Sequence, residues 1–157
     1  MPGNLLAKER AIVTLTTTGA SITSGSAGIA NATANFDGRA AGNAPDDFQA
    51  QFEFICKWTT VPAVGAIAAE LYLLPLLDGT NAPDIDLTAV ASRLPYAAFV
   101  GTFEIAVLPV TATDMRFISP LVTFNPLLFR PYILNRSLQT MTANWTLKAV
   151  SVQAQYT

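Results

Sequence analysis

Apolar and polar residues alternate strictly along residues 49–58. Large apolar side chains occupy every second position from Phe52 to Trp58, and polar side chains fill most positions between them. A period of two predicts a β-strand with one buried and one solvent-facing surface. Residues 67–74 form a second apolar run without alternation, which predicts either a central strand or one covered by a neighbouring subunit.

The remaining pattern predicts four more strands. They cover residues 100–107, 114–118, 127–134 and 144–154, and in the first of them Phe103, Ile105 and Val107 are expected to point inward. Residues 87–94 have room for one helical turn before Pro95. Short strands punctuated by proline and glycine, with no long amphipathic helix, predict an all-β fold. The long connections favour a jelly-roll-like antiparallel β-sandwich with an extended N-terminal arm.

The first 48 residues differ from the rest of the chain. They are rich in Gly, Ala, Ser, Thr and Asn, and only residues 11–15 and 30–36 have strand character. Segments of this composition are flexible or ordered by a partner. We therefore expect an extended N-terminal arm and loop over residues 1–48 and the β-sandwich domain over 49–157. In the alternative, residues 11–15 are simply the first strand of the sandwich.

The chain is poor in charge. Charged residues make up 13% of its 157 residues and the net charge is −2, whereas ordinary domains carry about 25% charge. Such a surface favours association with copies of itself or a larger assembly. Scattered lysines and arginines argue against nucleic acid as a partner. No apolar run suits a membrane span, and the N-terminus lacks the order of a signal peptide, so we expect synthesis in the cytoplasm.

The side-chain inventory argues against catalysis. The chain has no histidine, which removes the commonest general base and metal ligand. Its single cysteine, Cys56, is in phase with the apolar face of its strand and is expected to be a small buried hydrophobe. Glu53, Glu70 and Glu104 alternate with inward apolar residues, so they are expected to face solvent. The sequence predicts no catalytic, cofactor-binding or metal-binding residues and no cofactor.

Two binding alternatives remain open. The segment from Asp78 to Asp86 contains three carboxylates that could hold a cation, although its spacing does not fit an EF-hand loop. Aromatic side chains could form a platform for sugar stacking, the candidates being Trp58, Tyr72, Tyr96 and Trp145. Tyr96 follows Pro95 in a loop and is the best exposed of these. The competing hypothesis is therefore a carbohydrate-binding or receptor-binding sandwich of a phage tail or fibre.

The sequence LYLLPLLDGTN, from Leu71 to Asn81, resembles the capsid decoration or cement proteins of bacteriophages. The run Val100-Gly101-Thr102-Phe103 fits the strand that follows in this family. The chain departs from the family at Arg130-Pro131-Tyr132, which occurs early and is followed by another strand. The resemblance implies a β-sandwich subunit, commonly trimeric, on the outer surface of a virion. Its partners would be the major capsid protein and copies of itself, with no nucleic acid and no membrane.

Under this hypothesis, two apolar stretches are the expected capsid and subunit contacts. The contact residues are Leu5, Leu6, Ile12, Val13 and Leu15 in the arm, and Phe124, Leu127, Leu128, Phe129 and Tyr132 in FNPLLFRPY. The second stretch has more large apolar residues than one strand face can bury. Ordinary core packing is the alternative, because exposed and buried apolar runs look alike in sequence.

Overall fold

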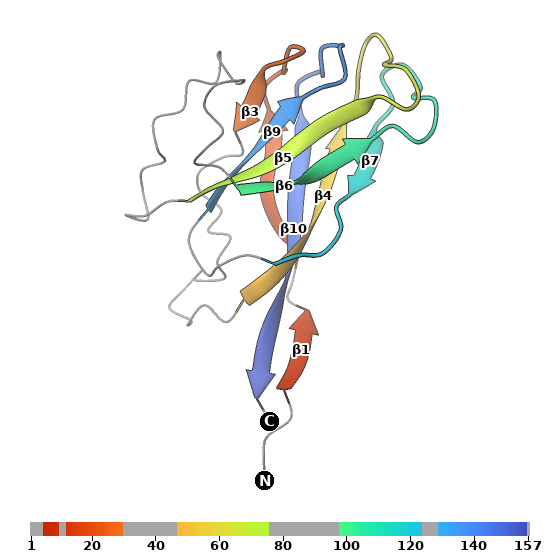
Figure 1. The fold of residues 1–157 in the computed structure, drawn as a ribbon. Coiled ribbons are helices and arrows are strands. Elements are labelled where there is room, and N and C mark those ends of the chain that lie inside the picture. The colour runs from red at the N-terminus through yellow and green to blue at the C-terminus, as the bar shows by residue number, and fades with distance from the viewer. Residues whose placement is uncertain (1–4, 10–11, 30–46, 76–97, 124–128, 157) are drawn as a thin grey trace.

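The computed structural model describes residues 5–9, 12–29, 47–75, 98–123 and 129–156 (Figure 1). These residues form β-strands joined by loops, and none of them belongs to a helix that could span a membrane. The strands are β1 (Leu5–Glu9), β2 (Val13–Gly19), β3 (Ala27–Ile29), β4 (Asp47–Cys56), β5 (Ile67–Pro75), β6 (Ala98–Glu104), β7 (Met115–Ile118), β8 (Val122–Thr123), β9 (Phe129–Asn135) and β10 (Trp145–Tyr156). The all-β prediction is confirmed.

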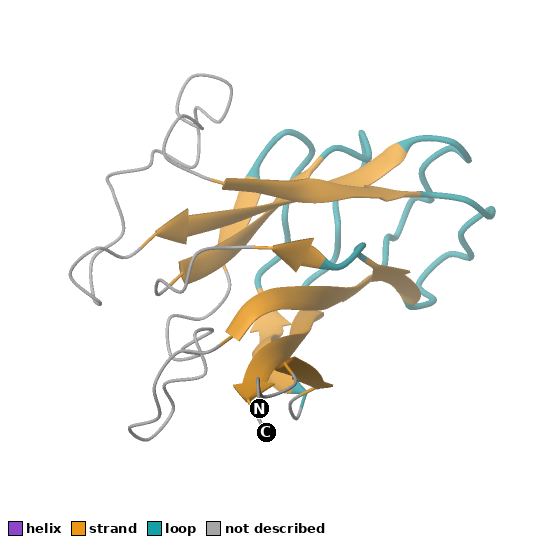
Figure 2. Ribbon diagram, turned by 60° about the horizontal axis from the view of Figure 1, so that its bottom comes forward, coloured by secondary structure: helices purple, strands orange, loops and turns teal. Residues whose placement is uncertain are grey.

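The strands form two antiparallel sheets that face each other (Figure 2). In the larger sheet, β1 and β2 lie one after the other along β10, which pairs on its other side with β4. β7 and β8 likewise share the far side of β4. The smaller sheet has the order β3-β9-β5-β6.

The pairings are nested along the chain. β1 and β2 pair with β10, β3 pairs with β9, β4 pairs with β7 and β8, and β5 pairs with β6. The chain is therefore arranged as one long antiparallel hairpin that is folded over on itself. The pair β10–β4 completes the larger sheet, and the pair β5–β9 completes the smaller one. This is jelly-roll connectivity, and it confirms the predicted sandwich.

Aromatic side chains from both sheets meet in the core. The Phe54 ring of β4 lies 5.4 Å from that of Phe103 on β6 and 6.0 Å from that of Trp145 on β10, measured between centroids. Phe117 of β7 lies 6.1 Å away. The predicted alternation along β4 is confirmed, because Phe52, Phe54, Cys56 and Trp58 are all buried. Aromatic pairs at such distances add stability beyond the area that they bury.

β5 lies between β9 and β6 in the smaller sheet, and residues on both of its faces are buried. Leu71 and Leu73 belong to the core between the sheets, whereas Tyr72 points to the outer face of the smaller sheet. There its ring stacks on Tyr132 of β9, with centroids 5.0 Å apart. Burial, followed by the hydrogen bond to Glu70, raises the pKa of Tyr72 to about 12. The central position was one of the two alternatives predicted.

The N-terminal strands differ from the expected arm. β1 and β2 pair with β10 and β3 pairs with β9, so residues 13–15 follow the alternative of a first sandwich strand. β1, β3 and β8 carry no alternation long enough to predict them, and their pairing with longer strands positions them. The predicted strand 30–36 and the predicted helical turn 87–94 lie outside the described residues.

One inward assignment on β6 was wrong. Phe103 and Ile105 are buried as predicted, but Val107 is exposed. Backbone bonds from Gly65 to Ile105 and from Ile105 to Ala66 tie position 105 to the β4–β5 connection, after β6 has ended at Glu104. The chain then leaves the ladder, so the two-residue period no longer governs the direction of Val107.

Candidate functional site

Four loops lie at one end of the sandwich, uppermost in Figure 1. They are residues 20–26, 57–66, 105–114 and 136–144, and we call them together the loop end. Backbone hydrogen bonds join one loop to the next: Ile22 and Met141 bond in both directions, and Thr142 donates to Lys57. Ala112 donates to the carbonyl of Trp58 at 2.9 Å. The loop end is therefore one bonded surface rather than four separate loops.

A buried polar network fixes the turn from residue 135 to residue 139. The Asn135 amide donates from Nδ2 to the carbonyls of Ile22 (2.8 Å) and Gln139 (2.7 Å). Its Oδ1 accepts from the backbone N–H of Ser137 at 3.0 Å and from its hydroxyl at 2.7 Å. The Ser137 hydroxyl also accepts from Trp58 Nε1 at 3.0 Å. Satisfied buried networks of this kind make a region rigid.

Leu138 sits at the tip of this turn in an unfavourable conformation. Its φ is 61°, and the side chain is 80% exposed. A left-handed backbone is costly for a residue with a bulky side chain, by roughly 1–2 kcal/mol, and exposure gives the leucine no burial in return. Glycine or asparagine would suit the turn better. Strain that the fold does not need motivates a functional explanation.

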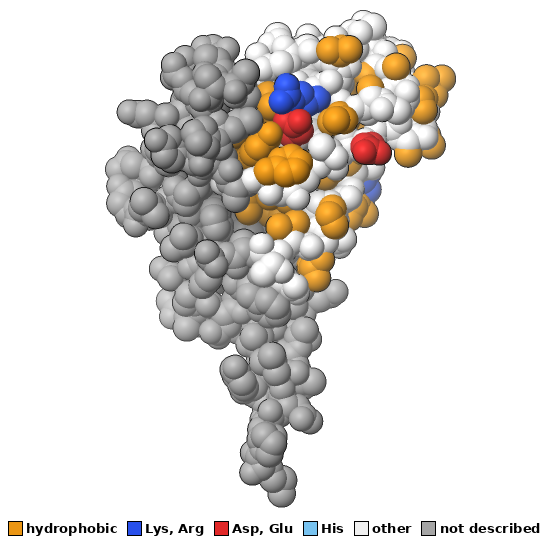
Figure 3. All heavy atoms as spheres, viewed as in Figure 1, with side chains coloured by type: hydrophobic (Ala, Val, Ile, Leu, Met, Phe, Trp, Pro, Cys, Tyr) orange, Lys and Arg blue, Asp and Glu red, His pale blue; other side chains and the backbone are white. Residues whose placement is uncertain are grey.

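Other apolar side chains are exposed on the loop end. They are Val64, Val107, Leu108 and Val110, and exposed hydrophobic groups are visible at the upper right of Figure 3. Each charged residue of the loop end is in an ion pair: Lys57 with Asp114 at 3.9 Å, and Arg136 with Glu70 at 3.0 Å. Several exposed apolar side chains at one end, with no unpaired charge beside them, are typical of a site that contacts another protein.

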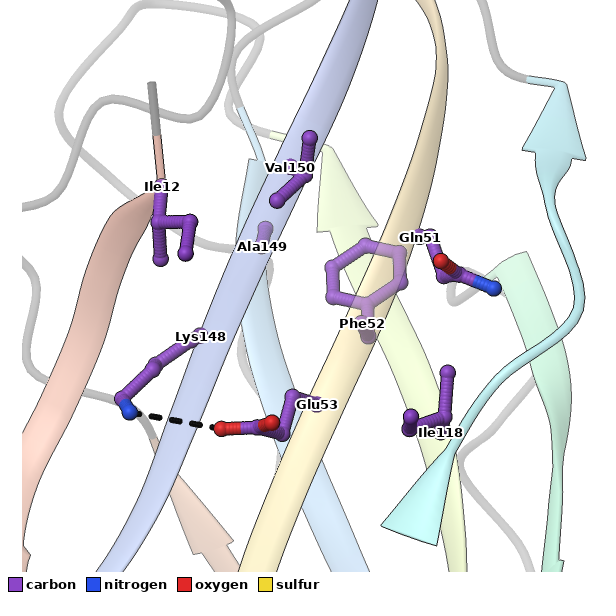
Figure 4. Close-up of a pocket in the computed structure, with 8 residues that line it drawn as sticks. All are labelled: Ile12, Gln51, Phe52, Glu53, Ile118, Lys148, Ala149 and Val150. Carbon is purple, nitrogen blue, oxygen red and sulfur yellow. Dashed lines mark hydrogen bonds and ion pairs between the residues drawn. The ribbon is translucent and has the colours of Figure 1, made fainter. Parts of the chain in front are cut away.

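A shallow pocket lies on the outer face of the larger sheet (Figure 4). Its volume is about 130 Å³, and we call it the outer-face pocket. Figure 4 shows Ile12 and Ile118 on opposite sides of β10 and β4, with Lys148 and Glu53 between them. The full lining is Ile12, Gln51, Phe52, Glu53, Ile118, Lys148, Ala149 and Val150.

Glu53 is the electrostatic centre of this face. One carboxylate oxygen lies 2.8 Å from the Arg116 guanidinium, and the other lies 3.3 Å from the Lys148 ammonium. Glu53 and Glu70 are thus each paired with cations on the outer faces of the two sheets, and Glu104 is exposed. Residues 12–29, 47–75, 98–123 and 129–156 contain no cluster of His, Cys, Asp and Glu that could hold a metal ion.

The predicted contact residues are distributed over several environments. Ile12 is exposed and lines the outer-face pocket, whereas Leu15 and Tyr132 are buried within the chain. For Tyr132 the structure agrees with the alternative of core packing, and for Leu15 with the alternative of a first sandwich strand. Burial prevents both from serving as surface contacts. The backbones of Leu5, Leu6, Val13 and Phe129 lie in β1, β2 and β9, and their role as contacts stays a prediction. Phe124, Leu127 and Leu128 lie outside the described residues.

The structure also locates the other candidate groups. Cys56 is buried, and its burial raises the pKa of the thiol well above its usual range, so it behaves as the predicted hydrophobe. Trp58, Tyr72 and Trp145 are buried and do not form an exposed sugar platform. Tyr96 and the acidic segment from Asp78 to Asp86 lie outside the described residues.

Sequence reasoning missed Leu138 and the loop end. The signal available was a single large apolar residue among polar turn formers, in NRSLQT. Residues 107–110 read VLPV, which resembles a strand, and the strand predicted over residues 100–107 includes the first of them. Neither pattern reveals that the two segments lie at the same end of the fold.

No protein-family model and no curated protein matches this chain. Among solved structures it is similar to a chain of the "Structure of infectious bursal disease virus Gx strain". The sequence identity is 12% and the TM-score is 0.38, over 94% of this chain and 36% of that chain. This chain therefore spans about a third of the matched chain. Its jelly-roll fold is established by its own strand pairing.

Proposed function

We propose that this chain is a structural subunit of a virus particle, a capsid decoration protein that binds the outer surface of the shell and stabilises it. The observation that carries the proposal is the loop end, a rigid surface with exposed apolar side chains and no unpaired charge. Burial of such a surface contributes roughly 25 cal/mol per Å² before the entropy of docking is subtracted.

Three further features support this function. The jelly roll is a common fold of viral capsid domains, the chain is poor in charge, and LYLLPLLDGTN resembles the phage decoration proteins. The proposed partners are the major capsid protein and further copies of this chain, as a homotrimer on the virion surface. Neighbouring copies hold one another at high effective concentration and so bind more tightly. The proposal includes no catalysis and no cofactor.

The proposal is tested on particles purified from cells that carry the parent genome. Quantitative mass spectrometry is expected to find this chain in the particle fraction, in a fixed ratio to the major capsid protein and in many copies. A few copies per particle would instead indicate a tail or fibre component. Complete absence from purified particles would overturn the proposal.

The contact surface is tested by rebinding purified chain to particles from which it has been stripped. The double substitution Leu108→Ser and Val110→Ser removes two exposed apolar groups from the loop end and is expected to weaken binding at least tenfold. Leu121→Ser is the matched control, because Leu121 is also exposed but lies outside the loop end. Equal loss with both variants would argue against a contact at this end.

One observation favours a second candidate, a carbohydrate-binding or receptor-binding sandwich of a tail or fibre. Phe99 is exposed on the outer face of the smaller sheet, and its ring lies 5.3 Å from that of Tyr72. Tyr72 in turn bonds to Glu70, the partner of Arg136. An exposed ring near charged hydrogen-bonding groups suits a sugar. A glycan array without hits, or one whose hits survive Phe99→Ala, would eliminate this site.

A further inference from the structure

We propose that Leu138 of one copy inserts into the outer-face pocket of a second copy, between Ile12 and Ile118. This inference rests on the proposed assembly role and names the surfaces through which copies of the chain meet. We call the exposed Leu138 side chain the knob.

The knob is presented by a turn built to hold it. Asn135 and Ser137 are both buried, and their hydrogen bonds reach Ile22, Trp58 and Gln139. Leu138 therefore projects from a fixed backbone and loses little conformational freedom on docking, which favours binding. The same network maintains a left-handed leucine that neither backbone preference nor burial favours in the isolated chain.

The pocket has the size and chemistry to receive a leucine. An apolar cavity of about 150 Å³ accommodates benzene, and the branched end of a leucine has fewer heavy atoms, so a pocket of about 130 Å³ is sufficient. Ile12 and Ile118 are 67% and 60% exposed. Their side chains would lose water contact when the knob enters. The Glu53 carboxylate and the Lys148 ammonium are already paired, so neither is left without a partner by docking.

Knob and pocket are different surfaces of the same chain, so the contact is head-to-tail. A head-to-tail contact closes into a ring or continues as a filament, depending on the rotation that relates the copies. A three-membered ring is the closed form that agrees with the proposed trimer. In an assembly that does not close, the copy at one end has an unfilled pocket and the copy at the other end has an exposed Leu138.

The test is sedimentation of the full chain over micromolar to millimolar concentrations, with one variant for each surface. Leu138→Asn removes the knob and keeps a residue that tolerates left-handed backbone, and Ile118→Lys blocks the pocket. Each variant alone is expected to be monomeric at concentrations where the wild type is oligomeric. Leu121→Lys is the control for added charge at an exposed leucine outside the pocket, and it is expected to assemble as the wild type does.

Mixing the two variants distinguishes this contact from others. Leu138→Asn retains its pocket and Ile118→Lys retains its knob, so a one-to-one mixture is expected to form dimers that do not grow further. Oxidation of Leu138→Cys mixed with Ile118→Cys is expected to link position 138 of one copy to position 118 of the other, since the native Cys56 is buried. Disulfides formed only between Leu138→Cys copies would show a knob-to-knob contact instead and overturn the inference.

Stability measurements separate loss of contact from loss of fold. Leu138→Asn and Leu138→Gly are expected to melt at or above the wild-type temperature under monomeric conditions, because both relieve the left-handed leucine. A wild type that stays monomeric throughout, or an oligomer that survives both surface variants, would overturn the inference. If the monomeric wild type nevertheless binds particles, the self-contact fails while the proposed decoration role stands.

Discussion

Asn135 uses the two donors and both acceptor positions of its side chain inside the loop end. Its partners come from three loop positions that are distant in sequence or separated by a turn: Ile22, Ser137 and Gln139. The sequence around it, LNRSLQ, reads as a polar turn and gives no sign that this asparagine is buried. Its side chain is buried because the fold brings it against the carbonyl of Ile22, which lies 113 residues away in the sequence.

Asn135→Ala is expected to lower the free energy of unfolding by about 2–4 kcal/mol, because it removes four hydrogen bonds of the buried network and leaves the Ser137 N–H without its acceptor. Gln139→Ala is the control. It also truncates a side-chain amide in the turn but keeps the backbone groups that accept from Asn135 and donate to Ser137. Urea denaturation of both variants measures the difference. Equal destabilisation would show that the network does not hold the turn.

Gly19 is required by the close approach of an aromatic ring. A Cβ atom at this position would overlap the ring of Trp145, whose Nε1 donates to the carbonyl of Ala20 at 2.8 Å. Gly19→Ala is expected to destabilise the fold by about 1–3 kcal/mol through overpacking. At Gly101 a Cβ meets nothing within 4 Å, so Gly101→Ala is expected to change stability by less than about 0.5 kcal/mol. Thermal melts compare the two.

Among the elements, β4 and β10 were predictable and the short edge strands were not. The alternation along β4 and the length of the β10 pattern come directly from local sequence, which has to provide one apolar face. β3 and β8 consist of three and two residues. Strands this short form because a longer neighbour offers backbone partners, and that information is not local.

The inner and outer faces of β4 predict different costs of truncation at two adjacent positions. Phe54 is fully buried against rings from both sheets, whereas Ile55 lies on the outer face and is half-buried. Phe54→Ala is expected to cost about 3–5 kcal/mol and Ile55→Ala about 1 kcal/mol or less. Guanidinium denaturation reports both values. Similar losses at the two positions would contradict the assignment of inner and outer faces.

At the scale of the whole molecule, the N-terminal segment belongs to the sandwich. β1 covers only the C-terminal part of β10, from Val152 to Tyr156, and β2 covers the part from Trp145 to Ala149. The two-strand ribbon of β1 and the end of β10 extends from the lower end of the molecule in Figure 1, opposite the loop end.

Truncation distinguishes the two N-terminal strands. Deletion of residues 1–9 is expected to leave a cooperatively melting fold, because β2 still pairs with β10. Deletion of residues 1–15 also removes the buried Leu15 and is expected to lower the free energy of unfolding by a further amount of about 2–5 kcal/mol. Calorimetry of the two truncations measures the difference. Identical melting would restore the view that residues 1–15 form a separate arm.

The sequence by itself determined the all-β class, the inner and outer faces of β4 and the burial of Cys56. These properties depend on residue type and on a period of two, and both are local. Only the tertiary structure decided which strands pair, that β1–β3 join the sheets, and that Leu138 projects from a rigid turn. Those outcomes depend on hydrogen bonds and ring contacts between residues far apart along the chain, which no local pattern specifies.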